Sequence, residues 1–336
     1  MDYGDIPGDA AQILSPLSGL SVDQVVEKYS NNKDLSTSIL QEPLDFKNSF
    51  LAENERFLQV GSTRLRTCHN IQHQHGGGPI YLFFHGLGGN LTQFEPLLRL
   101  LGELNEGFVA VDLPGFGLSD EQDSYQMLQV TQVVRDAFLK ITSHKKVILV
   151  GHSMGCHLAL HFATLFGMDF DIKDSVFLSP PAPVLPQLQK VSTRLALSVL
   201  CRLPFLFDWY RSYFDQSKGL QSSGIKQFFY KGDDYRKLWQ FHYNVQIKSR
   251  SLVAYLRGWV PVDWSKVSLI PSAVVITGEN DPVTPLDNAK TFYHALEEHI
   301  HHTKFITIED CSHNICFDQP QRLTKQFLDE VINRHG

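Results

Sequence analysis

The stretch VILVGHSMGCHLAL, residues 147–160, sets a small polar residue between two glycines where one apolar pattern ends and another begins. Its first four apolar residues predict a buried strand, and the apolar spacing after Gly155 predicts a helix. The pattern Gly151-x-Ser153-x-Gly155 in such a context is typical of a sharp turn that lifts a serine hydroxyl to the edge of a sheet. Ser153 is therefore the candidate nucleophile, and an ordinary tight turn is the alternative.

Two residues further along the chain are candidates to activate Ser153, because serine needs a histidine base and a carboxylate that orients the histidine. Asp281 lies in VVITGENDPVTP, just beyond a predicted strand, and His313 lies in FITIEDCSHNICF, beyond the next. We expect both to reach the edge that carries Ser153 and to form a triad with it. Two alternatives stay open: Asp281 caps a helix, and His313 is one of fifteen histidines without a catalytic role.

A glycine-rich stretch supplies candidate donors for the negative oxygen that forms during acyl transfer. In FFHGLGGN, residues 83–90, the chain leaves a predicted strand through a loop whose backbone can approach a ligand closely. The backbone amides of Leu87 and Met154 are the expected oxyanion-hole donors. The alternative is a connection without function. In VDLPGFGLSD, residues 111–120, Asp112 is expected to be structural rather than catalytic.

The rest of the chain alternates short apolar runs with longer amphipathic ones, which predicts an α/β fold with a mostly parallel sheet covered by helices on both faces. A hairpin is expected over residues 56–69 and a short helix over residues 22–29. The aromatic-rich interval after residue 182 interrupts the alternation and is read as a helical cap over the strand ends. The expected organisation is a covering segment (1–50), a core (51–182), the cap or lid (183–270) and the rest of the core (271–336).

Composition narrows the class of protein. The chain has 336 residues, 43% of them hydrophobic and 20% charged, with a formal net charge of −6, which gives no reason to expect a nucleic-acid partner. The five scattered cysteines favour a reducing compartment such as the cytoplasm. No signal peptide and no transmembrane run is expected. The histidines of HNIQHQHGGGP, His69, His73 and His75, are expected in a solvated loop, with no metal site and no cofactor.

These motifs together resemble the α/β-hydrolase superfamily from about residue 50 onward. Cap stretches such as LFDWYRSYFDQSKGLQSSGIKQFFY and RKLWQFHYN, together with CSHNICFDQP, are similar to fungal lipid droplet hydrolases, which are serine esterases and lipases. The resemblance implies neutral-lipid or phospholipid ester substrates, the triad Ser153, Asp281 and His313, and a place on lipid droplets. A fungal relative ends in the peroxisomal signal Ser-Lys-Leu, which this chain lacks, so peroxisomal location is not expected.

The function predicted from the sequence is a serine hydrolase that cleaves carboxylic esters of lipid-like substrates through an acyl-enzyme. Three alternatives stay open. The first is acyl transfer through the same acyl-enzyme. The second is acyltransferase chemistry from the pair His313 and Asp318, although we expect Asp318 to begin a helix. The third is a catalytically idle relative that binds a lipid or protein partner.

The cap segment over residues 191–214 combines helix-spaced aliphatic positions with aromatics and with Arg194, Arg202 and Arg211. This composition suits a peripheral lipid surface. The alternative is that these apolar side chains only roof the pocket.

Overall fold

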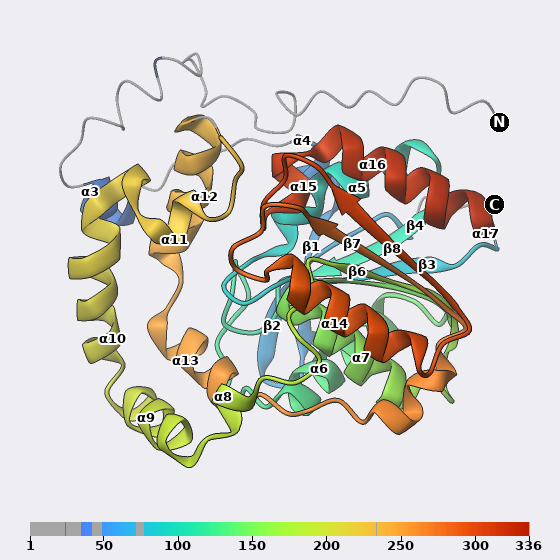
Figure 1. Ribbon diagram of the computed structural model, residues 1–336, viewed down its shortest axis with the longest axis horizontal. Coiled ribbons are helices and arrows are strands. Elements are labelled where there is room, and N and C mark those ends of the chain that lie inside the picture. Colours follow the sequence, from blue (N-terminus) through green and yellow to red (C-terminus); the bar gives the residue numbers. More distant parts are fainter. Residues whose placement is uncertain (1–23, 25–34, 42–48, 72–76, 233, 336) are drawn as a thin grey trace.

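A twisted eight-stranded sheet forms the centre of the computed structural model, which describes residues 24, 35–41, 49–71, 77–232 and 234–335 (Figure 1). The strand order is β1-β2-β4-β3-β5-β6-β7-β8. The strands are β1 (Glu55–Val60), β2 (Thr63–His69), β3 (Ile80–Phe84), β4 (Gly107–Val111), β5 (Lys146–His152), β6 (Asp171–Leu178), β7 (Ser272–Gly278) and β8 (His302–Ile308). The helix predicted over residues 22–29 lies outside the described residues apart from Gln24, and so do His73 and His75.

Antiparallel pairing is confined to one side of the sheet. β1 and β2 form the predicted hairpin, whose turn contains Gly61 with a φ of 57°, a conformation that costs glycine little. β2 also pairs antiparallel with β4. The six remaining neighbours in the strand order, β4, β3, β5, β6, β7 and β8, pair in parallel, so their carboxyl ends share one edge. The predicted α/β class with a mostly parallel sheet is confirmed.

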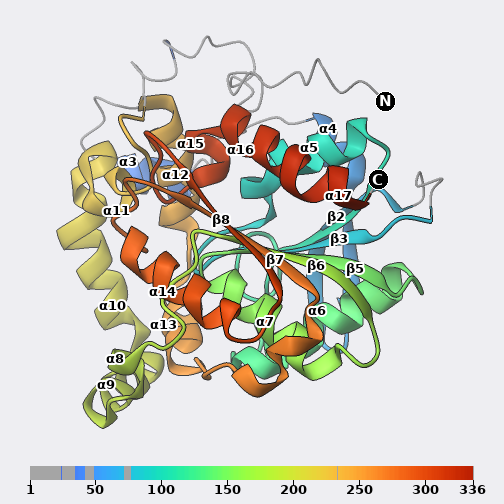
Figure 2. The same cartoon turned by 45° about the vertical axis from the view of Figure 1, so that its right-hand side comes forward.

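Alternating side chains of the buried strands build a core on each face of the sheet. In β3, Leu82 and Phe84 pack on one face, and Tyr81 and Phe83 on the other. The first face is covered by α6 (Met127–Ile141), α7 (Met154–Phe166) and α14 (Leu286–Glu297). The second face is covered by α4 (Ser49–Asn54), α5 (Glu95–Glu103), α15 (Ile315–Asp318), α16 (Pro320–Phe327) and the π-helix η6 (Leu328–Ile332), with α17 (Asn333–His335) after it. Figure 2 shows these two layers on either side of the strands.

The chain between β6 and β7 forms a helical cap that covers the carboxyl edge of the sheet. Its helices are α8 (Pro186–Gln189), α9 (Val191–Arg202), α10 (Pro204–Tyr210), the π-helix η3 (Arg211–Asp215), η4 (Gln216–Gln221), α11 (Ser223–Lys226), α12 (Asp234–Gln246) and α13 (Ser249–Arg257). The last helix before β7, η5 (Trp264–Leu269), packs on α7 instead, and its Val267 belongs to the core of the first face. A hydrophobic cluster of its own holds part of the cap together. Leu35 and Ile39 of α3 (Leu35–Gln41) complete this cluster, so a segment near the N-terminus packs on the cap.

No helix among the described residues is both long enough and apolar enough to cross a bilayer. The cysteines are all free, and Cys68, Cys156, Cys311 and Cys316 are buried. Burial raises the pKa of the Cys68 thiol to about 12. These buried thiols pack as apolar groups.

Candidate active site

Ser153 occupies a strained turn between β5 and α7. Its φ of 53° and ψ of −123° lie where residues other than glycine are rarely found. A Cβ on Gly155 would lie 2.0 Å from the Phe84 carbonyl oxygen, and one on Gly151 would lie 2.6 Å from the Gly155 carbonyl oxygen. Only glycine fits at either place, because strand and helix backbones are in direct contact there. The motif therefore folds into the sharp turn that its spacing predicts.

Asp281 and His313 are brought together by the loops after β7 and β8. His313 Nδ1 lies 2.8 Å from Asp281 Oδ2, and both side chains are almost fully buried. Asp281 Oδ1 accepts the amides of Val283 and Thr284 at 2.8 and 2.9 Å. Burial alone would raise the pKa of Asp281, but the hydrogen bonds from His313 and Thr284 outweigh it and lower that pKa. An ionised Asp281 that accepts the Nδ1 proton leaves His313 Nε2 as the free ring nitrogen.

Thr284 is a member of this cluster that the sequence analysis missed. Its hydroxyl lies 2.7 Å from Asp281 Oδ2, 3.2 Å from His313 Nδ1 and 3.1 Å from the Ser179 carbonyl oxygen. The hydroxyl donates to Asp281 Oδ2, the nearer of the two oxygens, and so fixes the carboxylate that faces the imidazole. A threonine three residues after an aspartate in a turn is a recognisable local signal, since such side chains bond within the turn.

Ser153 and His313 both line one cavity of about 480 Å³ beneath the cap. Asp281 is hydrogen-bonded to His313. Ser153 lines the same cavity as His313. In enzymes without substrate, the bond between nucleophile and base is often long and tightens when substrate binds. The walls contributed by the cap are mostly apolar and aromatic: Leu185, Phe228, Trp239, Tyr243, Ile247, Leu252, Leu256 and Trp259.

The peptide between Gly86 and Leu87 is held in one orientation beside Ser153. A Cβ on Gly86 would lie 3.1 Å from Ser153 Cβ, so the loop passes directly over the serine. The Gly86 carbonyl oxygen accepts from His85 Nδ1 at 2.8 Å and from the Gly89 amide at 3.0 Å. In a trans peptide the N–H points opposite to the carbonyl, so the Leu87 N–H is turned away from these donors. Met154 is the first residue of α7, where an amide has no partner within the helix.

His85 is neutral and carries its proton on Nδ1. The Leu113 amide donates to His85 Nε2 at 2.8 Å, so that nitrogen is an acceptor. Burial lowers the pKa of His85 and keeps the ring uncharged. The orientation of the Gly86–Leu87 peptide is therefore maintained as pH varies around neutrality.

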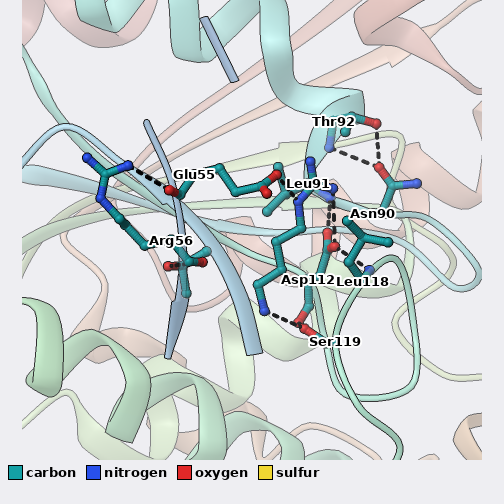
Figure 3. Close-up of polar contacts among 10 residues, drawn as sticks. Glu55, Arg56, Asn90, Leu91, Thr92, Asp112, Leu118 and Ser119 are labelled. Carbon is teal, nitrogen blue, oxygen red and sulfur yellow. Dashed lines mark hydrogen bonds and ion pairs between the residues drawn. The ribbon is translucent and has the colours of Figure 1, made fainter. Parts of the chain in front are cut away.

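Asp112 anchors the far end of the same loop (Figure 3). Its carboxylate is fully buried and accepts the Leu91 amide at 2.6 Å and the Leu118 amide at 2.9 Å. Arg66 pairs with it at 3.4 Å. Asn90 Oδ1 accepts the amide of Thr92 at 3.0 Å and starts η2 (Leu91–Phe94). Asp112 thus fixes loops rather than facing the cavity.

His152 stabilises the loop that carries His313. Its Nε2 donates to the His313 carbonyl oxygen at 2.9 Å. Burial, aided by the neighbouring His313, lowers the pKa of His152 to about 3, so the ring is neutral and can keep this bond across the physiological range. The two rings lie 4.9 Å apart. Sequence reasoning gave this residue no role, because the contact spans 161 positions of the chain.

Asp318 connects the His313 loop to the cap. Its Oδ2 accepts the Ser312 amide at 2.6 Å and the Tyr230 amide at 2.8 Å. The expectation that Asp318 begins a helix is wrong, because it is the last residue of α15 and Gln319 precedes α16. The carboxylate instead accepts amides from two segments that lie far apart in the chain.

Within the described part of the chain, no group of three or more histidine, cysteine, aspartate or glutamate side chains could hold a metal ion. The candidate site therefore consists of a hydroxyl, an imidazole, a carboxylate and backbone amides around an apolar cavity.

Comparisons with known proteins place this geometry among hydrolases. A model described as the alpha/beta hydrolase family matches residues 81–326. Lipid droplet hydrolase 1 of Saccharomyces cerevisiae is 38% identical over 358 aligned positions, which cover 95% of each chain. Epoxide hydrolase 3 of Mus musculus is 33% identical over 132 positions, covering 38% of this chain and 35% of the mouse protein.

Among solved structures, an esterase from Exiguobacterium antarcticum superposes with a TM-score of 0.65 at 18% identity, covering 82% of this chain and 98% of that one. At this identity the likeness concerns the fold alone.

Proposed function

The chain belongs to the alpha/beta hydrolase family, and from that membership we propose that it is a carboxylic ester hydrolase in which Ser153 is the nucleophile. His313 is the proposed base and Asp281 the residue that orients it. The amides of Leu87 and Met154 are the proposed oxyanion donors. An epoxide hydrolase of this fold attacks with an aspartate, so the serine at position 153 argues against that chemistry.

One observation carries the proposal: the strained Ser153 shares a cavity with a buried Asp281–His313 pair. In the proposed reaction, Ser153 Oγ attacks the ester carbonyl while its proton passes to His313 Nε2. The developing oxyanion accepts hydrogen bonds from the two amides. The C–O bond then breaks and His313 returns the proton to the departing alcohol. His313 then takes a proton from water, which attacks the acyl-enzyme; the bond between the acyl carbon and Ser153 Oγ breaks, His313 returns the proton to Ser153 Oγ, and the carboxylic acid leaves.

The apolar cavity supports an ester with a hydrocarbon acyl chain as the substrate. Its aromatic and aliphatic walls favour acyl chains, which gain about 0.8 kcal/mol for each methylene buried. The name of the yeast relative refers to lipid droplets, and we infer that this chain also acts on lipid esters, triacylglycerols or phospholipids, at droplet surfaces.

The test is covalent labelling by a fluorophosphonate combined with ester hydrolysis. We expect wild type to be labelled at Ser153, and Ser153→Ala to lose both labelling and turnover, by a factor on the order of 10⁶. His313→Ala should lose nearly as much. Asp281→Asn should lose less, on the order of 10⁴, because the base is still present. Turnover by Ser153→Ala at the wild-type rate, after contaminating esterases are excluded, would reject the assignment.

Hydrolysis and acyl transfer share every residue of this site, so the acceptor decides between them. Adding glycerol or monoacylglycerol to the assay should leave free fatty acid as the main product. A predominant new ester would instead assign the chain to acyl transfer.

Full activity of Asp281→Asn would show that another carboxylate orients His313.

A further inference from the structure

The cap segment over residues 191–214 exposes many large apolar side chains. Of the nineteen large hydrophobic residues that are exposed among those described, ten lie within residues 191–214, and these ten are exposed by 41% to 74%. We call this set the outer cap face: Val191, Leu195, Val199, Leu203, Phe205, Leu206, Trp209, Tyr210, Tyr213 and Phe214. Figures 1 and 2 both place its helices, α9 and α10, on the rim of the molecule away from the sheet. An apolar concentration of this kind marks an interaction surface.

The aromatic rings of the outer cap face are already ordered. The ring of Trp209 stacks on that of Tyr213 with centroids 5.8 Å apart, and the ring of Phe214 meets Trp209 edge-on. Arg211 is directed inward, where it donates to the carbonyl oxygens of Asn244 and Ile247 at 2.6 Å. The sequence analysis placed Arg211 with Arg194 and Arg202 on a possible lipid surface, but in the structure the Arg211 side chain anchors η3. The exposed rings therefore stand on a fixed base.

An arginine-lined pocket of about 340 Å³ lies beside this face, between α9 and α13. Arg194, Arg250 and Arg257 line it, with Asp123 as the acidic residue among the lining groups. Arg257 donates to Ser198 Oγ at 3.1 Å, and in the described chain neither Arg194 nor Arg257 forms an ion pair. Arg250 lies 3.8 Å from Glu121, which Lys248 already pairs with at 2.6 Å. The pocket therefore carries positive charge on a chain whose formal net charge is −6.

Helices α9 and α13 connect these features to the catalytic cavity. Leu195 and Val199 of α9 belong to the outer cap face, whereas Arg194 and Ser198 line the arginine pocket. In α13, Arg250 and Arg257 line the arginine pocket, whereas Leu252 and Leu256 line the cavity that contains Ser153. Helix α13 therefore separates the arginine pocket from the catalytic cavity, and α9 separates that pocket from the outer cap face.

We propose that the outer cap face docks on a phospholipid monolayer and that the arginine pocket binds a phosphate headgroup of that layer. Aromatic side chains with a polar edge sit favourably at the boundary between acyl chains and headgroups. Guanidinium groups bind phosphate in a bidentate manner, which a lysine cannot do. The proposal extends the proposed action on lipid esters, because it names the surface from which the substrate would enter.

The test is flotation of the full chain with triolein droplets coated with phosphatidylcholine and phosphatidic acid. All proteins carry Ser153→Ala so that the droplets are not consumed. Leu195→Glu with Trp209→Glu alters the outer cap face, and its control is Met168→Glu, which changes an 86% exposed side chain between α7 and β6. Arg194→Gln with Arg257→Gln alters the pocket, and its control for lost charge is Lys140→Gln with Lys146→Gln.

We expect the parent and both controls to float and the outer-face variant to lose at least tenfold in bound fraction. The pocket variant should bind about tenfold more weakly at low salt, a difference that shrinks as salt is added. The proposal is overturned if the parent stays in the soluble fraction, if the outer-face variant floats like Met168→Glu, or if sedimentation shows that the outer cap face joins two copies of the chain. Unchanged binding by the pocket variant would overturn the headgroup assignment.

The same substitutions in the active protein separate this proposal from the proposed function. All variants should hydrolyse a short water-soluble ester at the wild-type rate and unfold at the wild-type temperature. Lost flotation with intact hydrolysis would support docking. If the wild type failed to hydrolyse any ester, the proposed function would fall, and flotation would still decide the docking surface.

Discussion

At the scale of single residues, the candidate site depends on side chains that hold Asp281 and His313 in place. Asp281 is almost fully buried, and a buried carboxylate keeps its charge only when donors surround it. Two amides, one imidazole and the Thr284 hydroxyl supply those donors. Thr284 also touches His313 Nδ1, so it links the carboxylate, the imidazole and the Ser179 carbonyl.

Removing the Thr284 hydroxyl should slow catalysis more than it weakens binding. Thr284→Val keeps the shape but deletes a hydrogen bond to a charged group, which is worth about 1.5–3 kcal/mol. We expect kcat on a soluble ester to fall roughly tenfold to a hundredfold with little change in KM. Thr284→Ser should restore most of the rate. Wild-type kcat in Thr284→Val, or no rescue by serine, would show that the hydroxyl does not position His313.

At the scale of elements, the turn at Ser153 works because β3, β5 and α7 approach one another without side chains between them. Gly155 sits where α7 meets the backbone of β3, and a Cβ there would penetrate the Phe84 carbonyl. Gly77 is a useful contrast, because a Cβ at that position meets nothing within 4 Å. The contrast separates the backbone contact from the general cost of replacing a glycine.

Gly155→Ala should therefore cost about 3 kcal/mol or more in the free energy of unfolding, because strand and helix must separate to admit a methyl group. Gly77→Ala should change it by less than about 0.5 kcal/mol. Urea denaturation followed by circular dichroism measures both. Equal midpoints for the two variants would contradict the close backbone contact inferred at Gly155.

The elements were predictable from the sequence, whereas their mutual contacts were not. Apolar runs and the Gly151-x-Ser153-x-Gly155 spacing predicted a strand, a turn and a helix because those signals are local. The bond from His152 to the His313 carbonyl and the bond from Tyr230 to Asp318 join distant positions, and no spacing rule encodes them. The hairpin was predictable for the same local reason. The exposure of residues 191–214 depends on how the whole cap packs.

At the scale of the whole molecule, the protein buries several histidines in the neutral form. Burial lowers the pKa of His152 and His157 to about 3 and that of His242 to about 4, and it lowers the pKa of His85 and His161 as well. In the unfolded chain a histidine has a pKa of about 6.5. Below that pH the unfolded state binds more protons than the folded state, so stability is lost as pH falls.

Urea denaturation at pH 7.5 and 5.5 should thus show a marked loss of stability at the lower pH. Each buried histidine contributes up to about 1.4 kcal/mol per pH unit once the unfolded chain is protonated. Removing one of them in His157→Gln should reduce the dependence. Identical midpoints at the two pH values would contradict the neutral burial of these rings.

The bonds that join the cap to the His313 loop also restrict how the cap can open. Ser312 Oγ donates to the Gln227 carbonyl at 2.7 Å, the Asn314 amide donates to the Phe228 carbonyl at 2.9 Å, and Asp318 accepts from Tyr230. If residues 227–230 moved away, they would pull His313 from Asp281 and separate the proposed triad. These three bonds all come from residues 227–230 of the cap, and α8, α9 and α10 contribute none of them. The position of His313 next to Asp281 therefore depends on the second half of the cap, whereas the first half contacts α13.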